Sequence, residues 1–272
     1  MRPLLGVRRE PEFSPGRVED DAAILARTRD ALAARGVRLD VIDAADVPTT
    51  DAAAVLAMCQ SPAALAELDR CRVPVINAPD AIRACYRHET VARLAATDVP
   101  FPPTRLVATS SDADDAAAPC WVKRGDVHAM TASDVVFAPT AEALRAALAD
   151  FAARGITRAA LQGHVEGAVV KFYGVVDGRL FRCYTDAPTV PAPLPRLWDA
   201  ALAGARALGL EVFGGDLVVG ADGRPVLVDV NDWPSFARCR DEAADAIAGY
   251  VVDRLGMQPT AERGHHGSEA RT

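Results

Sequence analysis

Residues 211–232 read EVFGGDLVVGADGRPVLVDVND and carry the dipeptide Asp222-Gly223 between two apolar runs. Asp-Gly is a strong signal for a two-residue hairpin turn, because both residues tolerate positive φ. Counting pairs outward from that turn places Asp216 directly opposite Asp229. Asn231 lies two residues further along the same strand and therefore faces the same side of the sheet. The sequence thus predicts a hairpin that brings two carboxylates and an amide together.

The opposed carboxylates indicate a bound cation. Like charges that face each other across two strands repel, and a cation between them removes the repulsion. Carboxylate and amide oxygens are the ligands that a hard dication prefers. Asp229 also lies within an apolar run, residues 226–230. We interpret Asp216, Asp229 and Asn231 as a metal site. The alternative is that both aspartates are solvated on a sheet face.

A second hairpin precedes the first. Residues 169–184 read VVKFYGVVDGRLFRCY, and Asp177-Gly178 forms the expected turn. This register places Lys171 opposite Tyr184 and Tyr173 opposite Arg182, all on one face, while the other face is apolar. Two cations and two phenols on one face favour an anionic ligand. An ordinary solvated face is the alternative interpretation.

Composition excludes several classes of protein. The chain has 272 residues, is 50% hydrophobic and 25% charged, and carries a net charge of −7. This acidic balance argues against a nonspecific nucleic-acid binder. No apolar run approaches the ~20 residues of a membrane span, and the N-terminus lacks the apolar core of a signal peptide. The six cysteines form no C-x-x-C pair. We therefore expect a cytoplasmic protein with reduced thiols, which binds neither membrane nor nucleic acid.

Strands and helices alternate in the first part of the chain, which predicts a small Rossmann-like parallel α/β domain over residues 1–77. No G-x-G-x-x-G or P-loop motif is present. Residues 78–165 predict a long helix (79–96) and then an α+β subdomain, and residues 166–256 carry the two hairpins. Residues 257–272, which include His265-His266, are expected to form a disordered tail. Strands are expected at residues 4–9, 37–42, 55–58, 73–77, 121–123, 135–137 and 159–162 and around Leu106. The remaining helices are expected at residues 21–34, from residue 61 onward and at residues 140–154.

From about Asn77 to Tyr250, the order of these motifs resembles the ATP-grasp superfamily. The glutathione-synthetase and ribosomal-protein glutamate-ligase branch is the most similar type, and the inositol polyphosphate 1-kinases are similar too. The resemblance implies an α/β fold in which two α+β subdomains grip ATP, preceded by the small parallel domain. It also implies Mg²⁺ or Mn²⁺ on Asp216, Asp229 and Asn231. Residues 232–236 (DWPSF) resemble the family's Asn-x-x-Pro-Gly loop.

Upstream positions match the family's nucleotide site in the same order. Arg87 and Lys123 resemble its two phosphate-binding lysines, and Lys171 resembles the cation that faces the transferred phosphate. The segment that resembles the family's adenine-reading hinge consists of Gln162, Gly163, His164 and Val165. The lid, usually glycine-rich, is GDVHAMT at residues 125–131, and we expect His128 to donate to phosphate there. Other departures are Asp229 for a more usual Glu, Ser235 for the loop Gly, and Val169 for a ribose-contacting acid.

The resemblance implies an ATP- and magnesium-dependent carboxylate–amine ligase that works through an acyl phosphate. Its partners would be a small-molecule carboxylate and an amine, and the branch often forms homo-oligomers. Lys171 and Arg182 would be catalytic. Substrate would bind to Arg8, Arg9 and Ser14 in the first loop and to Arg238 and Arg240 near the metal loop, although all four arginines could instead be solvated.

Two other functions fit the same motifs. A small-molecule kinase would use the same ATP and metal groups but transfer the phosphate to a hydroxyl. A nucleotide-binding module without turnover would account for the glycine-poor lid. The net charge of −7 argues against a kinase for a highly phosphorylated substrate, and the intact metal triad argues against a module without turnover.

Overall fold

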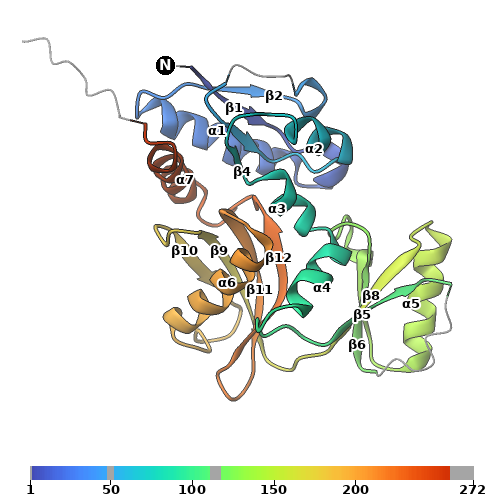
Figure 1. The fold of residues 1–272 in the computed structure, drawn as a ribbon. Coiled ribbons are helices and arrows are strands. Elements are labelled where there is room, and N and C mark those ends of the chain that lie inside the picture. Colours follow the sequence, from blue (N-terminus) through green and yellow to red (C-terminus); the bar gives the residue numbers. More distant parts are fainter. Residues whose placement is uncertain (1, 48–51, 111–117, 258–272) are drawn as a thin grey trace, which may run out of the picture.

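The computed structural model describes residues 2–47, 52–110 and 118–257 and contains three four-stranded sheets (Figure 1). The expected tail lies outside the described residues, except for Met257. None of the described helices is long and apolar enough to cross a membrane. All six cysteines are free thiols, and three of them are buried.

The first sheet is parallel, with the strand order β2-β1-β3-β4, and it confirms the small parallel α/β domain. Helix α1 (Val18–Ala33) starts three residues before the expected helix. Helix α2 (Pro62–Leu68) begins as expected, because the Ser61 hydroxyl accepts a hydrogen bond from the Ala64 amide at 3.2 Å. The strands are β1 (Leu4–Val7), β2 (Leu39–Ile42), β3 (Val55–Ala57) and β4 (Val75–Ile76), with short 3-10 turns at Pro11–Phe13 and Ala44–Asp46.

The long helix expected over residues 79–96 is two helices. Helix α3 (Pro79–Ala84) ends before Tyr86, whose backbone is extended, and helix α4 (Arg87–Ala95) starts directly after it. The Tyr86 hydroxyl donates to the carbonyl of Gln60 in the first domain. The break therefore puts Arg87 in the first turn of a helix. Both helices contribute to the hydrophobic core of the third sheet rather than to that of the middle sheet.

The middle sheet is antiparallel, with the order β5-β8-β6-β7, and it stands apart from the other two (Figure 1). Helix α5 (Ala141–Ala153) forms a separate core with this sheet, to which Phe151 contributes its ring. Thr140 caps this helix at its start, as its hydroxyl accepts from the Ala143 amide. The strands are β5 (Thr104–Ala108), β6 (Cys120–Arg124), β7 (Val135–Ala138) and β8 (Arg158–Gly163), with a 3-10 turn at Ala132–Asp134.

The third sheet contains both predicted hairpins in the order β10-β9-β11-β12. Lys171 pairs with Tyr184 and Tyr173 with Arg182, which confirms the register of the first hairpin. The sequence analysis placed no helix in this part of the chain, yet α6 (Leu194–Leu208) packs on the sheet and α7 (Arg240–Arg254) follows it. The strands are β9 (Ala168–Val175), β10 (Phe181–Tyr184), β11 (Val212–Val219) and β12 (Pro225–Asp232).

The second hairpin reaches the predicted pairing by a different route. A two-residue turn would pair Gly220 with Pro225, but Val219 pairs with Pro225 instead. Gly223 has a φ of +71° and donates its amide to the Gly220 carbonyl, as in a three-residue loop. This loop shifts the register by one residue. A β-bulge at Val228 then restores it, so that Asp216 pairs with Asp229 as predicted.

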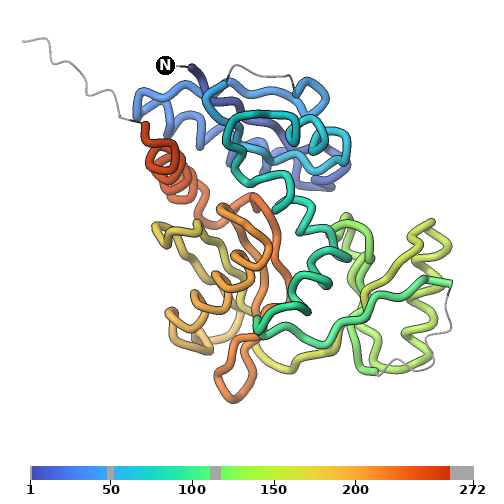
Figure 2. The backbone as a smooth tube through the Cα atoms, in the orientation of Figure 1, coloured from blue at the N-terminus to red at the C-terminus, as the bar shows by residue number. Residues whose placement is uncertain are grey.

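The first and third sheets share one hydrophobic core, although they lie at opposite ends of the chain. Helix α7 packs against α1, and Ile247 and Val251 join Ile24 and Leu25 in that core. Figure 2 shows α7, in red, beside the blue N-terminal domain. The buried side chain of Asn77 completes the junction through three hydrogen bonds to the backbone at the start of β11. The two domains are therefore one packed body.

Candidate active site

Asp216 and Asp229 face each other across β11 and β12, and each carboxylate has its own cation. Arg87 donates to Asp229 Oδ1 at 2.7 Å, and the Lys171 Nζ lies 3.0 Å from Asp216 Oδ1. Asn231 Nδ2 donates to Asp229 Oδ2 at 3.1 Å. The three residues expected to bind metal are thus neighbours, and their repulsion is already relieved by two basic side chains.

The two carboxyl groups differ in acidity. Burial alone would raise the pKa of Asp229, but the Arg87 guanidinium and the Lys123 ammonium outweigh it and hold that pKa well below its usual range. Burial raises the pKa of Asp216, and the Lys171 ammonium only partly opposes the shift. Asp229 is therefore the more acidic of the two groups, and Lys171 favours the charged form of Asp216.

The donor set fits Mg²⁺ better than a metal held wholly by protein. Among the described residues, no three His, Cys, Asp or Glu side chains come together in a way that could hold a metal ion. Two aspartates and one amide remain, and Mg²⁺ commonly binds one or two carboxylates together with water and substrate phosphates. Asn231 turns its nitrogen toward Asp229, which leaves its amide oxygen as a hard ligand.

Cavity B, of about 510 Å³, lies between the middle sheet and the third sheet. Arg87 and Lys123 line it together with Lys171, Asp216 and Asp229. The Nε of Arg87 is buried and has no hydrogen-bond partner among the residues that the structure describes. A buried donor without an acceptor is costly, so this nitrogen suits an anionic oxygen. The basic lining and the unsatisfied donor together fit a phosphate chain.

Lys123, on β6, lines cavity B and contacts the β-bulge of β12. Its Nζ donates to the carbonyl of Val228, the bulged residue, at 2.9 Å, and Gln162 Nε2 donates to the same oxygen at 3.4 Å. Burial, helped by the nearby Arg87 guanidinium, lowers the pKa of Lys123 to about 8. A buried ammonium has lost most of its hydration, so an anion next to it stabilises its charged form.

Cavity B also has a lining of aromatic and aliphatic groups. Residues 162–167 line it together with Trp121 and Val169. The Trp121 indole donates to His164 Nδ1 at 3.2 Å, and the Phe137 ring packs 5.0 Å from the His164 ring. The four residues expected to read adenine, 162–165, therefore lie together on the lining of cavity B.

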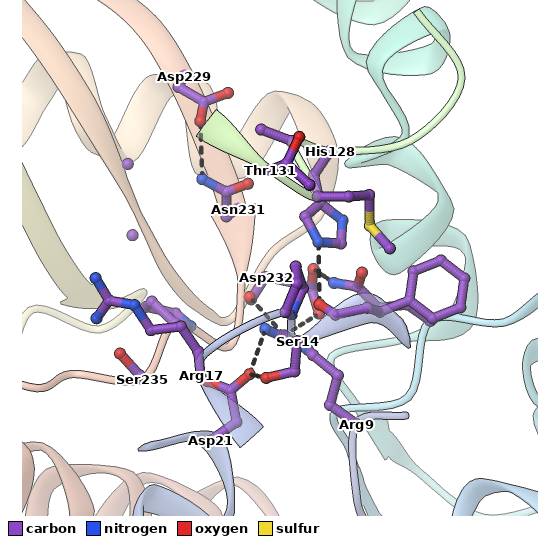
Figure 3. Close-up of a pocket in the computed structure, with 18 of the residues that line it drawn as sticks. Arg9, Ser14, Arg17, Asp21, His128, Thr131, Asp229, Asn231, Asp232 and Ser235 are labelled. Atoms are coloured by element: carbon purple, nitrogen blue, oxygen red, sulfur yellow. Dashed lines mark hydrogen bonds and ion pairs between the residues drawn. The ribbon is translucent and has the colours of Figure 1, made fainter. Parts of the chain in front are cut away.

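Cavity A, of about 530 Å³, lies on the other side of the carboxylate pair. It is lined by the loop after β1, by the start of α1, by residues 128–132 and by residues of β9, β11 and β12. Lys171 and Asp229 line both cavities, so the two cavities meet at these side chains. Figure 3 shows Asp229 and Asn231 on one side of cavity A and Arg9, Ser14 and Asp21 on the other.

A buried hydrogen-bond network forms the floor of cavity A. Arg9 donates to the side chains of Asp21 and Asp232 and to the carbonyls of Met58, Asp232 and Trp233. Ser14 Oγ donates to Asp21 at 2.6 Å. Arg9 and Ser14 thus line the cavity, as expected, but the guanidinium of Arg9 already donates hydrogen bonds to protein groups. Its main effect is to join the first domain to the end of β12.

His128 lies in cavity A rather than in cavity B, where it was expected to bind phosphate. Its Nε2 is 3.1 Å from the carbonyl of Phe13, and the two rings lie 6.2 Å apart. Burial, reinforced by the Arg9 guanidinium, lowers the pKa of His128 to about 4. The imidazole is therefore neutral near pH 7, which makes it a weak partner for a phosphate.

Four arginines expected at the site lie elsewhere, and none of them lines cavity A or cavity B. Each has a partner on the surface, which explains its position. Lys171 and Arg182, expected to share an anion, instead pair with separate carboxylates. The partners are Asp43 for Arg8, Glu242 for Arg182, the Tyr184 ring for Arg238 and Asp20 for Arg240.

Several residues that line cavity A were not predicted from the sequence. Arg17 is exposed at the N-terminal end of α1, and its ion pair with Asp20 is long, at 3.5 Å. Gln60 and Ser235 also line the cavity. The first loop was expected to bind substrate through Ser14, and extending that expectation along the loop to Arg17 would have included the arginine. Gln60 carried no comparable signal.

Comparisons with known proteins identify the fold. No protein-family model and no curated protein matches the sequence. Among solved structures, a RimK domain ATP-grasp protein from Sphaerobacter thermophilus DSM 20745 is similar with a TM-score of 0.68 and 18% identity, over 91% of this chain and 98% of that one. The D-alanine–D-alanine ligase of Bacillus anthracis, complexed with ATP, gives 0.69 and 12% over 94% and 99%. D-Cycloserine synthetase DcsG gives 0.60 and 21% over 93% and 99%. The chain has the ATP-grasp fold.

Proposed function

We propose that this ATP-grasp chain is an ATP-dependent ligase that activates a carboxylate as an acyl phosphate and joins it to an amine. The observation that carries the proposal is the meeting of two cavities at Lys171 and Asp229, one suited to a nucleotide and one to a polar acceptor. Similar structures include two D-alanine–D-alanine ligases and the ATP-grasp ligase PsnB in complex with a minimal precursor.

In this proposal, ATP lies in cavity B. Its base lies against Trp121 and the backbone of residues 162–165. Its phosphates extend toward Lys123 and Arg87, and the last phosphate reaches Lys171. The unsatisfied Nε of Arg87 and the desolvated ammonium of Lys123 both gain an anionic partner. Neither group then needs to reorganise during the reaction.

Asp216, Asp229 and Asn231 would hold Mg²⁺, which when bound neutralises negative charge on the phosphates. The residues around them prepare the site. Arg87 keeps Asp229 ionised, and Lys171 stabilises the charge of Asp216. These basic side chains hold the two carboxylates ionised and close together, so the site is formed before any ligand binds.

The reaction has two steps, and Lys171 serves the first. A substrate carboxylate in cavity A attacks the γ-phosphorus, the bond to the bridging oxygen breaks, and ADP leaves. The amine then attacks the acyl carbon, phosphate departs with the carbon–oxygen electron pair, and the nitrogen loses a proton. Negative charge builds next to the Lys171 ammonium in the first step, where a fixed cation lowers the barrier. Burial lowers the pKa of Lys171, but Asp216 more than offsets it, so the side chain is charged at neutral pH.

Hydroxylamine trapping tests the proposal. The protein is incubated with ATP, Mg²⁺, hydroxylamine and a panel of amino acids and other small carboxylates, and phosphate release and hydroxamates are measured. We expect a hydroxamate for the correct carboxylate, its loss in Lys171→Met and its retention in Arg182→Met. Arg182 is a matched control because it lies on the same sheet face but pairs with Glu242. A phosphate monoester without hydroxamate would identify a kinase instead.

A further inference from the structure

The loop between β6 and β7, residues 125–134, covers cavity A. We name it the roof loop. Five of its residues, 128–132, line cavity A, and none of its residues lines cavity B. The loop therefore covers the cavity assigned to the carboxylate substrate rather than the one assigned to the nucleotide.

Backbone amides of the roof loop are already bound within the loop. Asp126 Oδ1 accepts from the Val127 amide at 2.8 Å. Asp134 Oδ2 accepts from the amides of Met130 and Thr131 at 2.8 and 3.0 Å. A loop that cradles phosphate must offer free N–H groups. In this chain, these three amides donate to aspartate side chains, which hold the loop in its conformation before any ligand binds.

Arg124 and the last turn of α5 fix these aspartates. Asp134 has a side chain that is 1% exposed and pairs with Arg124 at 3.1 Å and with Arg154. Arg124 also donates to both oxygens of Asp126. One guanidinium thus connects the two aspartates that bind the loop backbone. These contacts connect the roof loop to the middle subdomain.

Two histidines fasten the roof loop to the rest of the molecule. The His128 Nε2 meets the carbonyl of Phe13 in the first domain at 3.1 Å, a bond drawn in Figure 3. His88 Nδ1, on α4, lies 3.1 Å from the carbonyl of Asp126. Because the His128 imidazole is neutral near pH 7, one ring nitrogen carries a proton and can donate to Phe13. This bond closes cavity A between the first domain and the middle subdomain.

We propose that the roof loop is a fixed cover of the carboxylate cavity and that His128 is the positioning residue that fastens it. The inference rests on the proposed ligase function. With the cover closed, bulk water is kept from the acyl phosphate until the amine attacks. Substrates too large for cavity A are excluded. His128 therefore acts on the fate of the activated carboxylate and not on nucleotide binding.

Hydrogen exchange of the full chain, followed by mass spectrometry, tests the fastening without any activity. In His128→Ala, the amides of Val127, Met130 and Thr131 should exchange about fivefold faster, the factor that corresponds to one net hydrogen bond. His128→Gln, which can donate to the same carbonyl, should return exchange to within about twofold of the wild type. His164→Ala, which removes an imidazole from cavity B, should leave the roof loop unchanged. Equal exchange in wild type and His128→Ala would overturn the proposal.

Steady-state kinetics test the role in turnover. In His128→Ala, we expect a roughly fivefold rise in the KM for the carboxylate and in ATP hydrolysed per amide formed, with the KM for ATP within about twofold. His128→Gln should restore coupling. A raised KM for ATP with normal coupling would place His128 on the phosphates and overturn the inference. If no carboxylate is activated, the proposed function fails, and the exchange experiment still decides whether His128 fastens the loop.

Discussion

Nucleotide binding should take up a proton at Lys123. Burial lowers the pKa of this ammonium to about 8, so half of the molecules carry a neutral Lys123 at pH 8. A phosphate placed against Nζ favours the charged form and brings the pKa back toward the usual ~10.5. The complex then holds a fully protonated lysine. Binding must therefore draw a proton from the buffer wherever the free protein has lost it.

The size of the effect follows from this pKa. Uptake should be about 0.1 proton at pH 7, about 0.5 at pH 8 and about 0.9 at pH 9. Affinity should fall as pH rises, because each neutral lysine must be protonated before it can bind phosphate. Between pH 7 and pH 9, the Kd for nucleotide should rise about tenfold. His128, whose pKa is about 4, remains neutral across this range and does not contribute.

Calorimetry in buffers of different ionisation enthalpy measures this uptake directly, with a non-hydrolysable ATP analogue and Mg²⁺. Lys123→Met should abolish the uptake and flatten the pH dependence. Lys171→Met is the matched control, because the pKa of Lys171 is raised and its charge is constant over this range. Uptake that persists in Lys123→Met, or uptake below about 0.1 proton at pH 8, would refute the reasoning.

Three further predictions follow from the site and the domain junction. Asp229→Ala should remove the dependence of ATP affinity on Mg²⁺, which calorimetry with Mg²⁺ and with EDTA would show; unchanged Mg²⁺ dependence would contradict the metal assignment. Arg17→Ala should raise the KM for the carboxylate about tenfold, the effect of losing one charge-assisted hydrogen bond, whereas Arg8→Ala should not change it, because Arg8 pairs with an exposed carboxylate outside cavity A. Asn77→Ala should lower the free energy of unfolding by about 2–4 kcal/mol in urea, because it removes the acceptor of the backbone N–H groups of Glu211 and Val212; a loss below about 1 kcal/mol would show that water replaces the amide.

Local patterns were enough to predict much of the fold. Alternation in the two hairpins placed Lys171 opposite Tyr184 and Asp216 opposite Asp229, and the structure has both pairs. The first prediction succeeded because the Asp177-Gly178 turn sets the register, whereas the second pair forms because the bulge at Val228 cancels the register shift of the longer loop. The alternation of strands and helices likewise predicted the parallel sheet of the first domain. In each case, residues close in sequence carry the information.

Other features depend on residues distant in sequence and could not be predicted in this way. Asp222-Gly223 favours either a two-residue or a three-residue loop, and only the sheet context selects the second and adds the compensating bulge at Val228. Arg182 is an anion-binding candidate from its strand alone, but Glu242 lies sixty positions away on α7 and neutralises it. A pattern that shows charge does not show which opposite charge the fold will bring to it. Helix α6 has a clear apolar periodicity that predicts a helix, whereas the apolar residues of α7 have little periodicity.

The core shared by α1 and α7 has a consequence for biosynthesis. The first domain lies at the start of the chain, yet Ala244, Ile247 and Val251, near its end, complete the apolar surface around Ile24 and Leu25. A ribosome must release the chain as far as Val251 before that surface can be covered. The nascent N-terminal domain therefore keeps an apolar helix face exposed until α7, which is made after all three sheets, has been synthesised. The middle sheet has a core of its own and can close earlier. Truncation within α7 should consequently damage the first domain more than the middle one.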